Sequence, residues 1–426
     1  MYCQLEILRH CFPSSVRRTL EELPESLDET YERILREIRK PNHGHAHRLL
    51  QCLVAAVRPL QVKELAEVLA FDFNTEEIPK LNLDWRWEDQ EEAVMSACSS
   101  LVMIVKDGDS RVVQFSHFSV KEFLTADRLA EPIRDVSRYH IRLEAAHTIL
   151  VRACLGVLLL LDDRTDCDSL KSFPLARYAA QYWASHARIE NVSSRIKDGM
   201  ECLFDADKPH FATWLWIYNE WGGSMSTMRP EKPEAVPLYY AAMLGLHSLA
   251  EHFIAKHPDH VNAKGGRDVT PLHVAVAAGH SDILFLLIEH GADVNGRGRR
   301  GDTPLHRASK KARLEAGQLL LNRGAGVDVP NSSNNTALIY ATAFGHTEFT
   351  RMLLERGAMI DVRCDFGRTP LHWAAANGQA EVVRLLLDRG ADYHMRDEDG
   401  KTPLELGSQW GHYEIVELLS KCDPSL

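Results

Sequence analysis

Residues 270–295 read TPLHVAVAAGHSDILFLLIEHGADVN, and this stretch carries the start and stop signals of two short helices. Thr270 can cap the first helix with its hydroxyl, and Pro271 suits the first helical position, where no N–H partner is needed. Gly279 suits a helix end in the left-handed conformation that a Cβ disfavours. The apolar stripe of the second helix consists of Ile283, Leu286 and Leu287. The stretch therefore predicts a pair of helices joined by a tight turn.

The same pattern returns every 33 residues along the C-terminal half of the chain. Four further blocks begin with Thr303-Pro-Leu-His, Thr336-Ala-Leu-Ile, Thr369-Pro-Leu-His and Thr402-Pro-Leu-Glu. A glycine falls nine residues after the threonine in every block except the second, where Ala312 replaces it. A degenerate copy, Pro237-Leu-Tyr-Tyr-Ala-Ala, precedes the first block. Since one pair of helices cannot bury its apolar face alone, the repetition predicts a stacked array.

This pattern resembles the ankyrin repeat, and the resemblance covers about residues 234–426. It implies an α-solenoid with one degenerate and five in-phase repeats, in which the histidine after Pro-Leu bonds back to the threonine loop. In the last copy Glu405 replaces that histidine, and the second helix carries Tyr413, Glu414 and Glu417. We interpret this copy as the polar C-terminal cap that a solenoid needs for solubility. The resemblance also implies binding of proteins through the hairpin tips and the exposed face of each first helix.

Residues 21–130 have a different pattern. Ser26 and Glu29 are spaced as a capping box that opens a helix, and two further apolar helices are expected over residues 49–57 and 62–70. Two strand-like runs, residues 101–105 and 111–115, flank the turn signal Asp107-Gly-Asp. Helices followed by a short hairpin predict a winged-helix domain.

Three segments of this region carry a second resemblance: Leu23-Pro-Glu-Ser-Leu-Asp-Glu-Thr-Tyr, Pro59-Leu, and Phe115-Ser-His-Phe-Ser-Val-Lys-Glu-Phe-Leu. They are similar to the winged helix that follows the nucleotide-binding module in fungal NACHT-type signalling NTPases with ankyrin repeats. The same segment type is known as a GPI-inositol-deacylase winged helix, a name that implies no hydrolase activity here. By this resemblance, residues 1–20 look like a remnant helix of the preceding module.

The nucleotide-binding module itself has no counterpart in the sequence. A P-loop needs a glycine-rich turn followed by Lys and Ser or Thr. The Gly-Lys-Thr at Gly400 lies inside a repeat, and Met395 stands where the first glycine of a P-loop would be. We therefore expect either a fragment of a longer protein or a truncated gene, from a lineage that had the module upstream.

Residues 131–233 are helical by pattern and form the expected helical linker domain. The clearest helices are predicted at 134–161, 176–189 and 211–221, and a hinge with three prolines is predicted at 225–237. The sequence as a whole thus predicts a mainly α protein: a remnant helix at 1–20, a winged helix with a small β-hairpin at 21–130, the linker at 131–233 and the ankyrin-repeat solenoid at 234–426.

Composition indicates a globular protein of a reducing compartment. The formal net charge is −11, and the nine cysteines form no CxxC pair. The N-terminus lacks the pattern of a secretory signal, and the most apolar run, residues 149–161, is shorter than the ~20 residues of a membrane span. We expect a cytoplasmic location, with the nucleus as the alternative, and no membrane contact.

Winged helices often bind DNA, but the charge of this one argues against it. The expected third helix, residues 87–96, contains four acidic side chains and no Lys or Arg, whereas phosphate contact relies on basic groups. We therefore expect no nucleic-acid binding, and we interpret Trp85 and Trp87 as packing anchors between domains.

No arrangement in the sequence indicates catalysis, a cofactor or a metal. His43, His45 and His47 could converge on a metal, but the simpler interpretation is a solvated loop between helices. No Ser/His/Asp or Cys/His pattern can be argued from spacing. We therefore expect a protein that is not an enzyme.

The candidate binding residues follow from the positions that vary within the repeat. They combine basic side chains with aromatic ones, a mixture that dominates binding hot spots and suits a protein or peptide with an acidic face. The alternative is a solvated basic surface without a partner. The candidates are Arg297, Arg299, Arg300, Asp302, Lys310, Lys311, Phe344, Arg363, Phe366, Arg368, Asn377, Arg396, Lys401 and Trp410.

Two functions remain open from the sequence. The first is a non-catalytic module in which the solenoid recognises a protein partner. The second, implied by the NACHT resemblance, is the sensor or regulatory half of a signal-transduction NTPase. No pattern indicates an oligomeric state.

Overall fold

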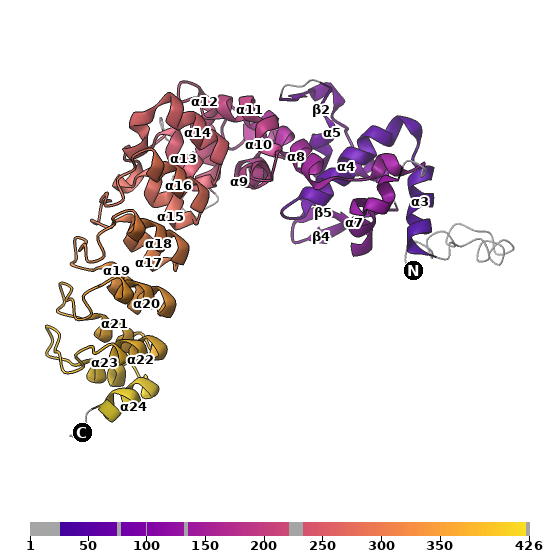
Figure 1. Cartoon of the computed structure of the whole chain (residues 1–426). Coiled ribbons are helices and arrows are strands. Elements are labelled where there is room, and N and C mark those ends of the chain that lie inside the picture. Colours follow the sequence, from indigo (N-terminus) through magenta and orange to yellow (C-terminus); the bar gives the residue numbers. More distant parts are fainter. Residues whose placement is uncertain (1–25, 75–77, 99, 132–134, 221–232, 423–426) are drawn as a thin grey trace. The chain divides into compact units, whose positions relative to one another are not determined.

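The computed structural model describes residues 26–74, 78–98, 100–131, 135–220 and 233–422 (Figure 1). The chain divides into two compact units, Met1–Pro233 and Glu234–Leu426. Helices predominate in both, and small sheets occur in the first, so the mainly α class is confirmed. The remnant helix expected at residues 1–20 lies outside the described residues.

The first part of the N-terminal unit combines short helices with two small sheets. The α-helices are α3 (Leu27–Glu37), α4 (His43–Ala55), α5 (Val62–Leu69), α6 (Gln90–Cys98) and α7 (Phe118–Thr125). The strands are β1 (Leu60–Gln61), β2 (Phe71–Asp72), β3 (Lys80–Leu81), β4 (Val102–Asp107) and β5 (Ser110–Phe115). The 3-10 helices are η1 (Lys40–Asn42), η2 (Leu83–Trp85) and η3 (Asp127–Ala130).

An antiparallel hairpin forms the wing of this part. Strands β4 and β5 pair from Val102↔Phe115 to Asp107↔Ser110, and β1 adds to the other edge of β5. Gly108 adopts the positive φ of 57° that the two-residue turn requires. The hydroxyl of Ser26 accepts the N–H of Glu29, so the predicted helix start is also confirmed.

The second part of the N-terminal unit is helical. Its elements are η4 (Ser137–Tyr139), α8 (Leu143–Leu158), η5 (Ser169–Ser172), α9 (Ala176–Ala187), α10 (Val192–Arg195), α11 (Lys197–Leu203) and α12 (Pro209–Glu220). The helix expected over 134–161 is shorter than predicted, because η4 and the extended Arg142 come before α8. Helix α8 packs on α4 and α9, and no helix of the described residues is long and apolar enough to cross a bilayer.

Within the described residues, Trp85 and Trp87 are not buried as packing anchors between domains would be. Their side chains are 47% and 50% exposed, next to Leu83, which is 59% exposed. Arg86, between them, turns inward and pairs with the buried carboxylate of Glu67. Trp85 ends η2 and Arg86 is extended, and the tryptophans on either side of this inward arginine both lie outside.

The C-terminal unit consists of helix pairs stacked along the chain (Figure 1). The first helices, which contact one another in order, are α13 (Pro237–Leu244), α15 (Pro271–Ala278), α17 (Pro304–Lys310), α19 (Ala337–Ala343), α21 (Pro370–Ala376) and α23 (Pro403–Gln409). The second helices are α14 (His247–Lys256), α16 (Ser281–Glu289), α18 (Leu314–Asn322), α20 (Thr347–Glu355), α22 (Ala380–Asp388) and α24 (Tyr413–Cys422). Two 3-10 helices, η6 (Pro258–Asn262) and η7 (Gly266–Asp268), precede α15.

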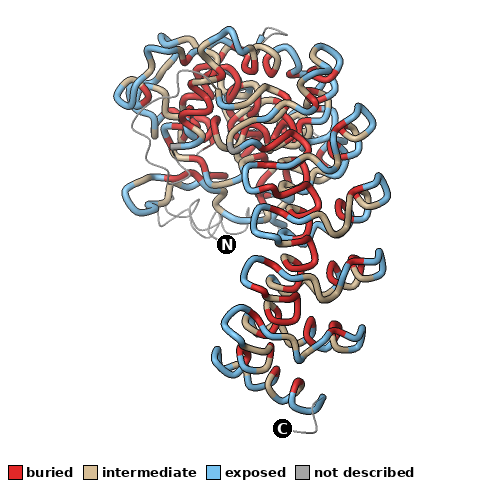
Figure 2. The backbone as a smooth tube through the Cα atoms, turned by 90° about the vertical axis from the view of Figure 1, so that its left-hand side faces the viewer, coloured by how far each residue is buried: buried red, intermediate tan, exposed pale blue. Residues whose placement is uncertain are grey.

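Small residues allow the first helices to approach closely. Ala275, Ala308, Ala341 and Ala374 occupy the same place in successive repeats, and each is fully buried. Leucines and isoleucines of the second helices complete a buried core that runs through the repeats (Figure 2). Stacking therefore buries, between neighbouring repeats, the apolar surface that a single repeat would expose.

Buried histidines tie each first helix to the next loop. The N–H and hydroxyl of Thr270 lie 3.4 and 2.8 Å from Nδ1 of His273, so the ring proton is on Nε2, which donates to the carbonyl oxygen of Asp302 at 3.0 Å. His306 bonds Asn335 and His372 bonds Lys401 in the same way. We call these three contacts the inter-repeat histidine bonds.

The third block lacks this bond, because Ile339 stands where the first, second and fourth blocks have histidine. The hydroxyl oxygen of Thr336 is buried there and has no hydrogen-bond partner among the described residues. In the last repeat Glu405 takes the role of the histidine locally, since its carboxylate accepts the N–H of Thr402 at 2.7 Å. That contact caps the helix without requiring a following repeat.

Ala312 gives the first prediction, because it adopts a left-handed φ of 53° where the other repeats have glycine. The variant Ala312→Gly should raise the free energy of unfolding by about 1 kcal/mol, since glycine removes the steric cost of that conformation. Urea unfolding measures the change. Gly411→Ala is the matched reverse: φ is 75° and no atom lies within 4 Å of the added Cβ, so stability should fall through backbone strain alone. An Ala312→Gly protein no more stable than its parent would contradict the argument.

The inter-repeat histidine bonds give the second prediction. Burial lowers the pKa of His273 to about 4, and it also lowers the pKa of His306 and His372. The unfolded chain, with histidine pKa values near ~6.5, therefore takes up protons that the folded chain does not. The free energy of unfolding should fall as pH drops from about 6.5 toward 4, by up to about 1.4 kcal/mol per pH unit for each histidine.

Urea unfolding of the whole protein at pH 7 and pH 5 measures this loss. The variant His306→Gln removes one of the three titrating rings, so its stability should depend less steeply on pH than that of the parent. Equal pH dependence in the two proteins would show that these histidines do not control acid stability.

Candidate protein-binding surface

The loops that carry most of the candidate residues are held to one another in series. The N–H of Ser332 donates to the carbonyl of Arg300 at 2.9 Å, and the N–H of Glu398 donates to that of Phe366 at 3.1 Å. At the turns after the second helices, the Asn295 side chain accepts the N–H of Gly326 at 2.9 Å. Each loop is thus positioned by its neighbour, so the side chains on it project from a fixed backbone.

Five basic side chains form the part of the surface that we call the basic patch: Arg297, Arg299, Arg300, Lys310 and Lys311. All five are exposed. Within the described residues, none of them lies within 4.0 Å of a carboxylate oxygen, although such pairs occur throughout the rest of the chain. The loop and the helix end of one repeat therefore present positive charge that the protein itself does not neutralise.

Aromatic side chains border the basic patch. The ammonium of Lys310 lies 5.8 Å from the ring centroid of Phe344 and equally far from that of Tyr340. Phe344 is 48% exposed at the end of α19, the helix next to α17. Tyr340 is a residue that sequence reasoning missed, although its position on the first helix of the repeat with Ile339 could have indicated it.

Asp302 does not belong to this surface, so its selection was wrong. Its side chain is buried, with Oδ1 accepting a hydrogen bond from Asn331 at 2.7 Å. Its backbone carbonyl receives the inter-repeat bond from His273. A buried loop residue that joins two repeats needs hydrogen-bond partners for its polar atoms, and Asp302 has them on both its side chain and its carbonyl.

The candidates of the last two repeats are exposed to different degrees and largely bonded within the protein. Arg368 is half-buried and pairs with Asp397 at 3.1 Å while lying over the ring of Trp373. Arg363 donates to the carbonyl oxygens of Gly367 and Arg396. The remaining contacts are Arg396 with Gly400 and Glu405, Lys401 with Gln409, and Asn377 with the carbonyl of Trp373.

Phe366 and Trp410 are exposed as expected, at 59% and 61%. The basic groups near them are occupied by carbonyls or carboxylates, in contrast to those of the basic patch. Among the candidate residues, unpaired positive charge is therefore concentrated in the basic patch, and Phe366 and Trp410 are separate exposed aromatics.

The histidines at 43–47 do not converge. His43 begins α4, where Nε2 bonds the carbonyl of Ile38 at 2.8 Å and Nδ1 faces Arg138 at 3.1 Å. His47 is one turn along the helix, against the ring of Tyr139. This helical placement replaces the loop that the sequence suggested, so that part of the interpretation is wrong.

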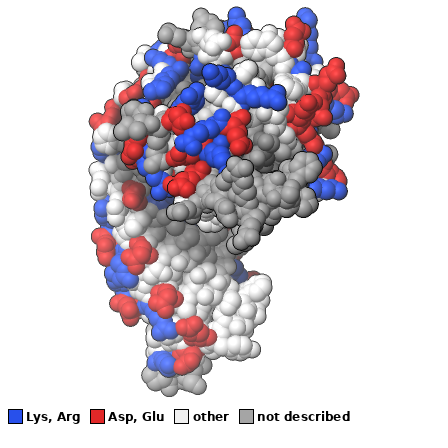
Figure 3. Space-filling view, turned by 90° about the vertical axis from the view of Figure 1, so that its right-hand side faces the viewer, with Lys and Arg blue, Asp and Glu red and all other residues white. Residues whose placement is uncertain are grey.

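The charge of the winged-helix part is mixed. On the face that Figure 3 shows, Lys and Arg side chains alternate with Asp and Glu, without a broad area of one sign. Helix α6 carries Glu91 and Glu92 in its first turn. This distribution is unlike the basic face that follows a nucleic-acid backbone.

Comparisons with known proteins agree with this geometry. Residues 238–331, 314–397 and 360–426 match the family described as ankyrin repeats (3 copies). Residues 31–133 match the family described as GPI inositol-deacylase, winged helix domain. Ankyrin repeats imply a protein-interaction module.

One curated relative is the azaphilone pigments biosynthesis cluster protein L of Monascus ruber, which is 33% identical over 290 residues. The match covers 63% of this chain and 60% of the relative, so the chain spans less than two thirds of that protein. The two family matches lie in different halves of the sequence. The chain carries a winged helix domain of the GPI inositol-deacylase type in its N-terminal half and ankyrin repeats in its C-terminal half.

Proposed function

We propose that this protein is a non-catalytic interaction module whose ankyrin repeats recognise an acidic segment of a protein partner in the cytoplasm. The observation that carries the proposal is the basic patch, five exposed cations without a carboxylate partner among the described residues. Opposite charge across an interface steers encounter and selects the partner. Phe344, beside Lys310, supplies an apolar contact at the edge of the same patch.

The rigidity of the loops supports this proposal. Association loses free energy when mobile loops must be ordered, and loops already tied to their neighbours avoid most of that cost. Arg300 lies on such a loop, since its carbonyl accepts a hydrogen bond from the N–H of Ser332 and the nearby Asp302 carbonyl accepts one from Nε2 of His273. The guanidinium groups can then bind carboxylates in bidentate geometry from a preformed backbone.

Charge reversal provides the third prediction. A variant with Arg299, Arg300, Lys310 and Lys311 changed to Glu should bind at least about tenfold more weakly to peptides selected against the wild-type protein from a random library. Those peptides should be enriched in Asp and Glu, and their affinity for wild type should fall as salt rises. Titration by fluorescence anisotropy measures the affinities.

The matched control reverses four basic residues elsewhere in the same unit: Lys256, Arg351, Arg356 and Lys421. It changes the net charge equally, so a similar loss in both variants would point to a general charge effect. Circular dichroism establishes that both variants remain folded. Selected peptides without acidic enrichment, or unchanged binding by the first variant, would place the partner site elsewhere.

The regulatory half of a NACHT-type NTPase is the second candidate. Its support is the winged helix domain, together with the exposed Leu83, Trp85 and Trp87, an apolar set available for a neighbouring module. A reading frame with a GxxxxGK[ST] motif directly upstream of the codon for Met1 would favour this candidate. Transcript sequencing across that boundary separates the two proposals.

A further inference from the structure

The degenerate first repeat ends in a turn that brings two imidazoles and a carboxylate together. Helix α14 ends before His257, and η6 follows at once with Pro258. The N–H of His260 donates to the carbonyl of His257 at 3.0 Å. In a 3-10 turn, side chains three residues apart eclipse one another, and the two rings accordingly stack with centroids 4.7 Å apart and planes inclined by 21°.

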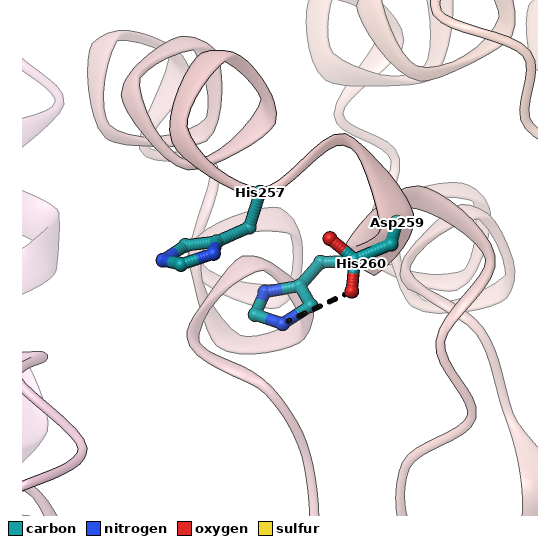
Figure 4. Close-up of side chains that lie close together, drawn as sticks. All are labelled: His257, Asp259 and His260. Carbon is teal, nitrogen blue, oxygen red and sulfur yellow. Dashed lines mark ion pairs between the residues drawn. The ribbon is translucent and has the colours of Figure 1, made fainter.

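Asp259 completes the group (Figure 4). Its Oδ2 lies 3.9 Å from Nε2 of His260, and one ligand atom from each of the three residues lies within 4.8 Å of the others. Among the residues that the structure describes, this is the one group of three metal-ligating side chains that meets that distance. We call it the His257 cluster.

A second observation points to a ligand at this place. Nδ1 of His260 is buried and has no hydrogen-bond partner in the described part of the chain. A buried imidazole nitrogen without a partner costs free energy, which a metal ion bound through Nδ1 would recover, whereas an ion bound through Nε2, the nitrogen 3.9 Å from Asp259, would not. Asp259 is exposed, so its carboxylate can turn toward the rings without disturbing the core.

We propose that the His257 cluster binds one divalent ion of the zinc class through His257, Asp259 and His260. Imidazole nitrogens favour Zn²⁺ over Ca²⁺ or Mg²⁺, and two histidines with one carboxylate form a common three-residue zinc set. Zinc–nitrogen bonds are ~2.0–2.1 Å long, so ligand atoms now separated by up to 4.8 Å must close to ~3.4 Å by side-chain rotation. Solvent supplies the fourth ligand on the side of Asp259.

The location gives the metal a structural consequence. Asn262, at the end of η6, donates to the carbonyl of Gly291 and accepts the N–H of Asp293, which joins the degenerate repeat to the next one. A metal held by His257 and His260 fixes the turn from which Asn262 projects. The bound ion therefore stabilises the junction between the degenerate repeat and the regular ones.

Zinc titration of the full chain tests this inference, which is the fourth prediction. Isothermal titration with ZnCl₂ should show one site that His257→Gln and His260→Gln each weaken at least about tenfold, as loss of a ligand requires. Asp259→Asn changes an exposed side chain, so it should weaken zinc binding without affecting folding. Co²⁺ bound at the same site should give visible absorption bands that these variants lose.

His247→Gln and His290→Gln are the matched controls, since both residues are exposed histidines of the same unit outside the His257 cluster. They should bind zinc as wild type does. Zinc should also raise the melting temperature of wild type and of the controls, but not of the cluster variants. Wild type that binds no zinc, or cluster variants that bind it as tightly as wild type, would overturn the proposal.

Discussion

The hydrogen bond from a buried histidine to the loop of the following repeat is the contact on which the C-terminal unit depends. It requires a neutral ring with its proton on Nε2, because Nδ1 already faces the threonine that begins the helix. Burial satisfies that requirement by lowering the pKa of His273 to about 4. The same side chain thereby caps its own helix and holds the loop of the next repeat in place.

The position of the basic patch follows from the way in which neighbouring loops contact one another. Each loop is held by the repeat before it, and on a later loop the charge of Arg368 is neutralised inside the unit by Asp397. The loop from Arg297 to Arg300 has no such acid opposite it, because the following loop, residues 330–335, carries Asn and Ser in place of Asp or Glu. A difference in polar residues between two neighbouring loops therefore decides where free charge remains.

The N-terminal unit uses buried polar contacts differently. Glu67 lies in the interior, where its carboxylate receives Arg86 and the N–H of Leu175, although burial still raises its pKa. Arg58 binds the equally buried Glu64 through two nitrogens. These ion pairs compensate the buried carboxylate charges inside the fold. Arg86 turns inward to make its pair, and the tryptophans on either side of it lie outside.

The sequence by itself determined the repeat, its period, its helix caps and the hairpin of the winged helix, because these depend on neighbours within about four residues and on a phase kept across blocks. It could not determine that Asp302 is buried, that Arg86 turns inward, or that Lys310 lies beside Tyr340. Those facts depend on contacts between residues about 20 to 38 positions apart. The stacking of one repeat on the next decided the first and the third, since a loop side chain is exposed or buried according to the loop that follows it, and the buried carboxylate of Glu67 decided the second.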